Sequence, residues 1–257
     1  MLDFQLFAHG IDIDCCRGNM FYLDIVIMKN SSLIFFSALL LLLGSTAYGQ
    51  NREVRSVTDF NHIRAGGSWN VILKKGDRNE VLIEAKNLDL DKVITEVKNG
   101  TLDLRLEKGN YRNMGLEVTV TFINLDGIHS SGSGNLKCIS DLRSDELEIV
   151  LSGSGNATFN SLLADELDLT MSGSGDLSIA GGSVGDINVK QSGSGNLKAI
   201  NLISEAADIN KSGSGNASLT INESLSLRSS GSGNVEYKGN PSVNNVSISG
   251  SGRLVKK

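Results

Sequence analysis

One pentapeptide recurs seven times between residues 131 and 253, and it constrains the fold more than any other feature of the sequence. The consensus is SGSGN, and Asp176 and Arg253 replace the Asn in two copies. The copies are Ser131–Asn135, Ser152–Asn156, Ser172–Asp176, Ser192–Asn196, Ser212–Asn216, Ser230–Asn234 and Ser249–Arg253, at intervals of 21, 20, 20, 20, 18 and 19 residues. A fixed period near 20 predicts stacked repeats, in which each unit buries its apolar face only against its neighbours.

The flanks of the motif alternate between apolar and polar residues. Before the second copy, Leu147, Ile149 and Leu151 share one parity, whereas Glu148 and Val150 share the other. This is the period of a half-buried strand rather than a helix. Leucine-rich repeats have a similar length, but their fixed Leu/Asn frame is absent. The sequence therefore predicts an all-β fold, a β-solenoid with coils of about 20 residues, about three short strands in each coil and a rise of ~4.8 Å.

In such a solenoid the same motif position stacks from coil to coil. The two glycines fall on the inward parity, where a narrow corner leaves no room for a Cβ atom. The two serines are expected in an outward ladder, and the Asn ends the segment, where amides can stack. The predicted ladder residues are Ser152, Ser154, Asn156, Ser172, Ser174, Asp176, Ser192, Ser194, Asn196, Ser212, Ser214 and Asn216.

Composition supports this interpretation and excludes several classes of protein. Of the 29 glycines, 14 belong to the seven motifs, so the glycine excess is positional. A chain with 40% apolar residues is not a disordered polymer. The 24 basic and 29 acidic residues leave no surplus of positive charge for phosphate backbones, so we expect no nucleic-acid partner.

The N-terminal residues are typical of export. An apolar run at 33–43 follows Met28 and Lys29, and small residues precede Gln50. Residues 28–49 are therefore predicted to be a signal peptide cleaved after Gly49, because the run is too short to span a membrane. We expect residues 1–27 to be a mis-called upstream extension. The predicted location is the periplasm, the outer-membrane surface or the exterior, and no transmembrane span is expected in the mature chain.

Removal of the leader changes the cysteine count. Cys15 and Cys16 fall within residues 1–27, which leaves Cys138 alone in the exported chain. A single Cys cannot form an intramolecular disulfide. We therefore expect Cys138 to be a small buried hydrophobic residue.

Residues 50–126 lack the SGSGN motif but alternate in the same way. They also contain most aromatic residues of the mature chain, including Phe60, Trp69 and Tyr111. We interpret them as irregular β segments that cap the solenoid, because an uncovered end would expose unpaired strand edges. Residues 127–257 are then the repeat solenoid.

A resemblance to a known family covers about residues 54–257. The segments Phe60–Ala85 (FNHIRAGGSWNVILKKGDRNEVLIEA) and Asp91–Gly109 (DKVITEVKNGTLDLRLEKG), followed by tandem SGSGN coils, resemble the family called putative auto-transporter adhesin, head GIN domain. The resemblance implies a right-handed, single-stranded β-helix exported by Bacteroidetes-type bacteria, with no established activity. Only four residues follow the last motif, so we do not expect a C-terminal translocator barrel.

Catalysis and cofactor binding find little support in the sequence. The mature chain has only His62 and His129 and a single Cys, and seven near-identical Ser-Gly-Ser copies cannot all be nucleophiles. A phosphate-binding loop needs a following helix, whereas a strand follows here. We expect neither enzymatic activity nor a cofactor.

Acidic residues form a second repeated feature. Asp145, Glu146 and Glu148 recur 20 residues later as Asp165, Glu166 and Asp168, and Asp186, Glu205 and Asp208 continue the column. Like charges one coil apart repel by roughly 1 kcal/mol per pair in water. Calcium binding could relieve this repulsion. The alternative is a solvated acidic edge with Lys190, Lys211 and Arg228 nearby and no metal.

These features favour a non-catalytic, adhesin-like or structural protein of the cell envelope, with glycans or envelope proteins as partners. The enzymatic alternative is a polysaccharide-active β-helix, which would need convergent carboxylates and aromatic platforms for sugar rings. The repeats supply the carboxylates but almost no aromatic residues. The oligomeric state is left open.

Overall fold

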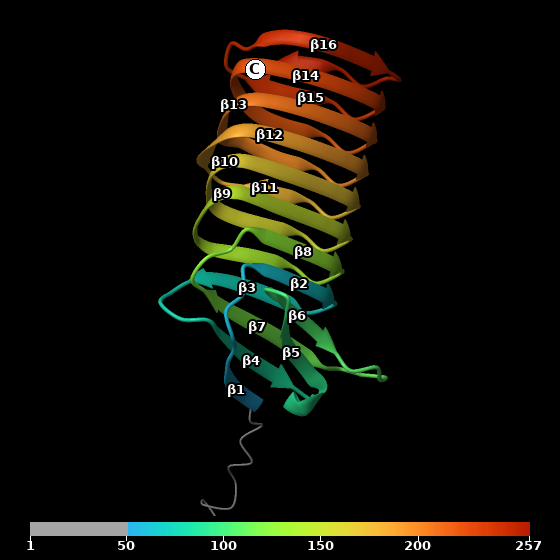
Figure 1. Cartoon of the computed structure of the whole chain (residues 1–257). Coiled ribbons are helices and arrows are strands. Elements are labelled where there is room, and N and C mark those ends of the chain that lie inside the picture. Colours follow the sequence, from blue (N-terminus) through green and yellow to red (C-terminus); the bar gives the residue numbers. More distant parts are fainter. Residues whose placement is uncertain (1–50) are drawn as a thin grey trace, which may run out of the picture. The chain divides into compact units, whose positions relative to one another are not determined.

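The computed structural model describes residues 51–257. The predicted signal peptide, the upstream segment 1–27, Cys15 and Cys16 lie outside the described residues. Within residues 51–257 the chain forms a tall stack of strands (Figure 1). The strands are β1 (Asn51–Ser56), β2 (His62–Gly67), β3 (Asn70–Lys75), β4 (Glu80–Lys86), β5 (Val93–Lys98), β6 (Thr101–Leu106), β7 (Gly115–Phe122), β8 (Gly127–Gly132), β9 (Leu136–Gly153), β10 (Ala157–Gly173), β11 (Leu177–Ile179), β12 (Gly182–Gly193), β13 (Leu197–Gly213), β14 (Ala217–Gly231), β15 (Val235–Lys238), β16 (Ser242–Ser249) and β17 (Leu254–Lys256), with a short 3₁₀ helix, η1, at Leu90–Lys92.

The strands from β8 to β17 pair in parallel, each with the strand one coil further along the chain. Glu146 in β9 pairs with Glu166 in β10, and Glu166 pairs with Asp186 in β12. The coils therefore repeat every 20 residues or so and complete about six turns. The predicted all-β solenoid is confirmed.

Each coil has one sharp turn, at the SGSGN motif. In β10 the paired segments Ala157–Phe159, Ser161–Ala164 and Glu166–Gly173 join through bends rather than loops, and the register shifts between Phe159 and Ser161. In the coils of β9, β10, β13 and β14 the three predicted short strands are therefore segments of one long strand that bends around the core, whereas the coils of β11–β12 and β15–β16 are each divided into two strands.

The inward parity of each strand builds the core. One column of buried residues runs through seven coils without interruption, and its members are Ile63, Ile128, Ile149, Leu169, Val189, Ile209 and Leu227. Such columns remove apolar surface from water in every coil, which is the main stabilising contribution to the stack. Cys138 lies in a parallel column, fully buried and unpaired, and burial raises the pKa of its thiol to about 11. The expectation for Cys138 is confirmed.

The motif glycines are required by the distance between successive coils. A Cβ atom on Gly155 would lie 1.9 Å from the carbonyl oxygen of Gly134, one coil below. Gly153 also has a φ of +108°, a region that side chains rarely adopt, and its Cβ atom would lie 2.2 Å from the Gly132 oxygen. A side chain here would therefore clash with the backbone of the neighbouring coil, along the stack. The alternation pattern predicts instead a clash inside the corner of the same coil.

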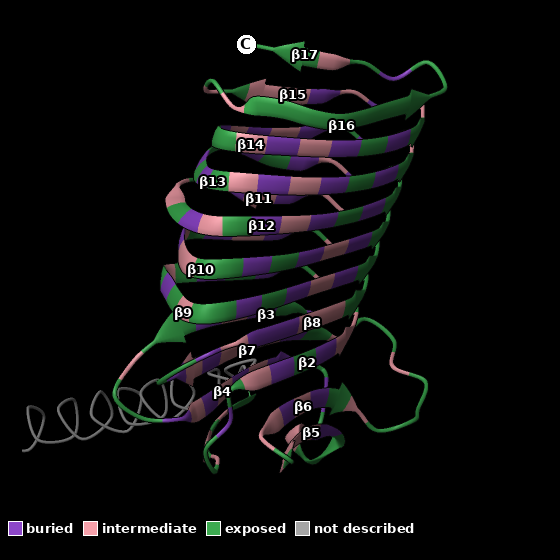
Figure 2. Cartoon of the chain, turned by 45° about the horizontal axis from the view of Figure 1, so that its top comes forward, coloured by how far each residue is buried: buried purple, intermediate pink, exposed green. Residues whose placement is uncertain are grey.

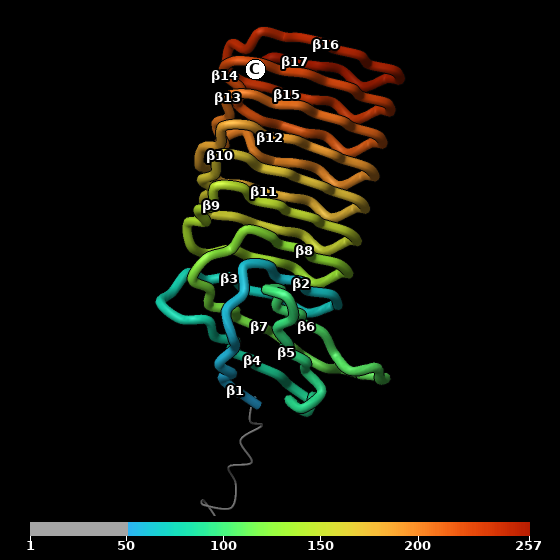
Figure 3. Tube along the Cα trace, in the orientation of Figure 1, coloured from blue at the N-terminus to red at the C-terminus, as the bar shows by residue number. Residues whose placement is uncertain are grey.

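The first coil of the stack consists of β2 and β3, which lie in the N-terminal segment interpreted above as irregular β segments that cap the solenoid. β2 pairs in parallel with β8, and β3 pairs in parallel with β9. A degenerate motif copy, Gly66–Asn70 (GGSWN), spans the turn from the end of β2 to the start of β3, in register with Ser131–Asn135. Figure 3 shows the chain leaving the stack after β3 and returning to it at β8.

The remaining N-terminal strands close the lower end of the stack. β6 and β7 lie beneath β2 and β3 in parallel, and the antiparallel strands β5, β4 and β1 then end the sheets. Trp69 occupies the position of a second motif glycine. Its ring covers Gly67, where a Cβ atom would lie 1.8 Å from a ring carbon. The bulky residue fits because it belongs to the first motif copy, below which no motif turn lies within the described residues.

Candidate functional site

The outward parity of the stack forms straight rows of identical side chains. The first motif serines pair coil to coil in one row, and its members are Ser131, Ser152, Ser172, Ser192, Ser212, Ser230 and Ser249. The second serines of the predicted ladder, Ser154, Ser174, Ser194 and Ser214, are exposed in the adjoining turns. The repeat therefore presents hydroxyl groups at the regular spacing of the coils.

The motif asparagines link successive coils. The backbone N–H of Asn156 donates to Oδ1 of Asn135 at 3.1 Å, and that of Asn216 donates to Oδ1 of Asn196 at 3.0 Å. The same bond joins every motif copy to the one before it, beginning at Asn70. These side chains satisfy the turn N–H groups, so the asparagine row has a structural role.

Asp176 keeps this link because a carboxylate is also an acceptor. Its Oδ1 accepts from the backbone N–H of Asn196 at 2.9 Å, and its Oδ2 lies 2.6 Å from Lys198 Nζ. Partial burial would raise the pKa of Asp176, but the hydrogen bonds from Lys198 and Asn196 outweigh it, and the pKa falls below its usual value.

The predicted acidic column is resolved into separate rows. Glu146, Glu166 and Asp186 stack in one row. Glu148 and Asp168 stack in a second row, in which Asn188 separates Asp168 from Asp208. Asn188 Nδ2 donates to Glu166 Oε1 at 3.0 Å and to Asp168 Oδ1 at 3.1 Å, so one amide links both rows.

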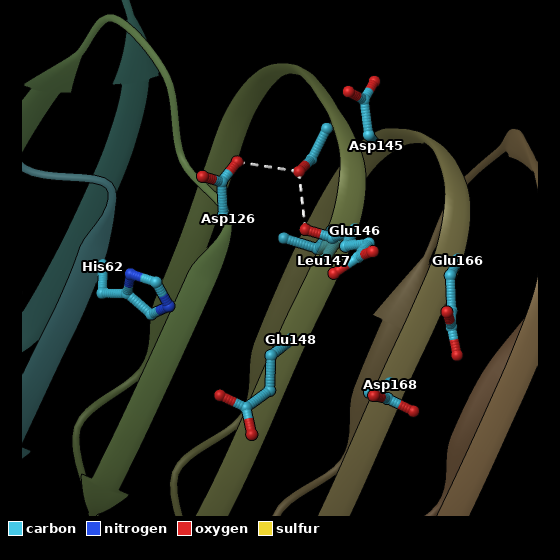
Figure 4. Close-up of a pocket in the computed structure, with 9 residues that line it drawn as sticks. His62, Asp126, Asp145, Glu146, Leu147, Glu148, Glu166 and Asp168 are labelled. Carbon is cyan, nitrogen blue, oxygen red and sulfur yellow. Dashed lines mark hydrogen bonds between the residues drawn. The ribbon is translucent and has the colours of Figure 1, made fainter.

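The lower coils of these rows line an open groove of about 500 Å³ (Figure 4). Its walls contain five of the predicted acidic residues, Asp145, Glu146, Glu148, Glu166 and Asp168, together with His62, Asp126, Ser144 and Leu147. Asp165 instead lines a neighbouring groove of about 550 Å³ with Lys75 and Arg143. Asp186, Glu205 and Asp208 line neither groove.

Hydrogen bonds fix one side of the acidic groove. Ser144 Oγ lies 2.8 Å from Asp126 Oδ1 and 2.7 Å from the Glu146 carbonyl oxygen, as the dashed lines in Figure 4 show. His129 Nε2 lies 2.8 Å from Glu148 Oε2. Sequence reasoning missed His62, Asp126 and Ser144 because they lie outside the acidic repeat. In the sequence, the only indication of a role for these three residues is that each is polar and lies in or next to the first coils of the stack.

The groove has the chemistry of a cation-binding surface. Within residues 51–257 no group of three or more His, Cys, Asp or Glu side chains is arranged to hold a metal ion. The stacked carboxylates are exposed to solvent and supported by strands on both sides. Such a surface can bind ammonium or guanidinium groups by charge-assisted hydrogen bonds.

A buried polar column was not predicted, and Lys211, which was expected near the solvated acidic edge, belongs to this column instead. Inward positions just before the motif carry Leu151 and Met171 in two coils, and then Gln191, Lys211 and Ser229 in the next three. Gln191 Nε2 donates to the carbonyl oxygen of Gly195 at 2.6 Å. The Lys211 side chain is only 4% exposed, and its Nζ atom has no hydrogen-bond partner. Burial lowers the pKa of Lys211.

Within the described residues, no helix combines the length and apolarity that crossing a membrane would require.

Comparison with solved structures finds the same architecture in Bacteroidetes proteins. A putative adhesin from Bacteroides fragilis is 25% identical with a TM-score of 0.72, and the match covers 82% of this chain and 98% of that one. Putative adhesins from Parabacteroides merdae and Parabacteroides distasonis are each 19% identical, with TM-scores of 0.66 and 0.64, and cover 82% of this chain and 97% and 98% of their own. A search of curated proteins gives no match. The family model described as putative auto-transporter adhesin, head GIN domain, matches residues 59–241, and the chain belongs to that family.

Proposed function

We propose that this protein is exported to the cell envelope or cell surface and acts there by non-catalytic, adhesin-like binding. The predicted signal peptide supports export, and the likeness to a putative adhesin at 25% identity supports a binding role. The stacked rows of Ser and Asp/Glu side chains support contacts that are individually weak and repeated along the surface.

The observation that carries the binding role is the acidic groove of β8, β9 and β10. Six carboxylates face one open volume: Asp126, Asp145, Glu146, Glu148, Glu166 and Asp168. Hydrogen bonds to Ser144, His129 and Asn188 hold four of them in place. A ligand that enters the groove therefore meets acceptors that are already ordered, which reduces the entropic cost of binding. The ligand class is a cationic group on a glycan or an envelope protein, such as an amino sugar or a basic peptide segment.

The test is a binding panel of amino-bearing glycans, neutral glycans and basic peptides, measured at low and high salt. We expect binding to the cationic members only, weaker at high salt. The double variant Glu146→Gln, Glu166→Gln should lose most of this binding. Glu223→Gln is the matched control, because Glu223 is exposed on β14 outside the groove. Binding that survives the groove variant, or no binding to any member, would refute this role.

Export has its own test. Cell fractionation of the producing bacterium, with N-terminal sequencing of the product, should find the chain in the envelope or medium with Gln50 at its start. A product retained in the cytoplasm with Met28 at its start would contradict export, whatever the groove binds.

A further inference from the structure

The last coils of the stack differ in charge from the rest of the molecule. Residues 51–234 contain 18 basic and 24 acidic side chains, whereas residues 235–257 contain four basic and one acidic. The basic residues are Lys238, Arg253, Lys256 and Lys257, and the acidic one is Glu236, which is paired with Lys257. An acidic solenoid therefore has a basic C-terminal end.

The same end exposes apolar residues that belong to the core columns. Val243, Val246 and Ile248 of β16 pair with Leu225, Leu227 and Ser229 and continue their inward positions. They are 45%, 41% and 37% exposed, because no further coil among the described residues lies over them. Val255 of β17 is also 37% exposed, but it pairs with Glu236 and is not part of a core column. Figure 2 shows β16 exposed along its whole length, in contrast to the buried positions of the coils beneath.

The outer edge of β16 is poorly suited to accept another strand. Pro241 immediately precedes it, and Asn245 forms a bulge with a φ of 50° in the middle of the strand. Proline and bulges are features that prevent edge strands from pairing. A second copy docked end to end would also place Arg253 and Lys256 near their own counterparts. Self-association through this end is therefore opposed by both backbone geometry and charge.

We infer that the C-terminal end, defined as β16, β17 and Arg253, is a docking surface for a lipid membrane rich in anionic phospholipids. Its basic side chains match the phosphate groups, and Val243, Val246 and Ile248 can enter the upper part of the acyl region. Insertion is shallow, because the free strand edge has unpaired backbone groups that must stay hydrated at the headgroup level. The solenoid axis then projects the acidic groove away from the membrane. The inference does not depend on what the groove binds.

Vesicle co-sedimentation tests this inference with residues 50–257, which contain all the described strands and the whole core. This form excludes the apolar run at 33–43, which could itself bind lipid, and the full chain is measured beside it. We expect binding to vesicles of phosphatidylglycerol and phosphatidylcholine, and little binding to phosphatidylcholine alone. Each basic side chain should contribute roughly fivefold to partitioning, so Arg253→Glu with Lys256→Glu should reduce it by at least 25-fold.

Two matched controls separate the surface from general effects. Ile203 is 46% exposed on the flank of the stack, so Ile203→Ser should leave binding unchanged, whereas Val246→Ser should weaken it. Lys137→Glu changes an exposed charge on β9 and should reduce binding less than twofold. Circular dichroism checks that each variant is folded. The groove variant Glu146→Gln, Glu166→Gln should bind vesicles normally, so that failure of the groove and failure of this surface are distinguishable.

The inference is overturned if residues 50–257 do not bind anionic vesicles at low salt. It is also overturned if vesicle binding persists both in the double variant Arg253→Glu, Lys256→Glu and in Val246→Ser. Light scattering tests the remaining alternative. If the protein does not bind vesicles but forms a dimer that Val246→Ser disrupts, this end is an interface with a second copy of the chain instead.

Discussion

Replacing Lys211 by Met should stabilise the protein. Lys211 is 4% exposed in the core of β13, and its Nζ atom has no partner. Burying a polar group without a hydrogen bond costs about 1–3 kcal/mol in proteins, and the ammonium charge increases that cost. Met171 occupies the same column two coils below and is buried, so the column accommodates a methionine side chain. We expect Lys211→Met to raise the free energy of unfolding by about 1–3 kcal/mol at pH 7.

The pH dependence tests the reason for this effect. Because the pKa of Lys211 is lowered in the folded state, the unfolded chain binds more protons between the lowered pKa and the ordinary value of 10.5. The wild-type protein therefore gains stability as the pH rises through that interval. The cost of burying the charge is fully present below it. Lys211→Met lacks this slope, so its advantage should shrink as the pH approaches 10.5.

Urea unfolding followed by circular dichroism, from pH 6 to pH 10, measures both quantities. Lys190→Met is the matched control, because Lys190 is exposed on β12 in the preceding coil and its replacement should change stability by less than about 0.5 kcal/mol. The reasoning is refuted if Lys211→Met is less stable than the wild type at pH 7. It is equally refuted if the two proteins show the same pH dependence.

Three further predictions concern the stack. Gly175→Ala should lower the free energy of unfolding by more than about 3 kcal/mol, because its Cβ atom would lie 2.0 Å from the Gly155 carbonyl oxygen. Gly181→Ala is the control: there is open space around Gly181, so this change should leave the free energy of unfolding from the same urea titration unchanged. Asp176→Asn should change stability at pH 7 by less than about 1 kcal/mol, since the lost ion pair with Lys198 is solvent-screened. Because the pKa of Asp176 is lowered in the folded state, this group stabilises the wild-type protein above its unfolded pKa, and that stabilisation is lost as the pH falls through the folded pKa. Asp176→Asn should lack this part of the acid sensitivity. If the variant and the wild type lose stability identically in acid, the lowered pKa of Asp176 is contradicted. Trp69→Ala should cost about 3–5 kcal/mol by uncovering the lower corner; a loss below 1 kcal/mol in thermal unfolding would show that the ring is dispensable there.

The repeat by itself determined the architecture. A 20-residue period, combined with strict alternation of apolar and polar residues, leaves a stacked β coil as the structure that buries every apolar residue and pairs every strand. The burial of Cys138 follows from the same parity. These features depend only on local sequence pattern, and each coil repeats the information in the next.

Only the tertiary structure decides the features that depend on contacts between neighbouring coils. The motif glycines are needed because Gly134 and Gly155 approach each other along the stack, a contact between residues 21 positions apart that parity does not reveal. The copy at Gly66–Asn70 joins the stack only because the 51 residues between β3 and β8 (76–126) bring β8 back onto β2, and the degenerate GGSWN sequence conceals it.

The acidic groove shows the same division. The carboxylates of β9 and β10 could be found from their 20-residue repeat, whereas Asp126 and His62 reach the groove from the first coils, where no repeat marks them. Lys211 is the opposite case: from the sequence we expect it among the basic residues near the solvated acidic edge, and only the packed structure shows that it is buried and that its amine has no partner there. Sequence periodicity fixes which side of the sheet a residue faces, and only the packing of successive coils decides what it contacts.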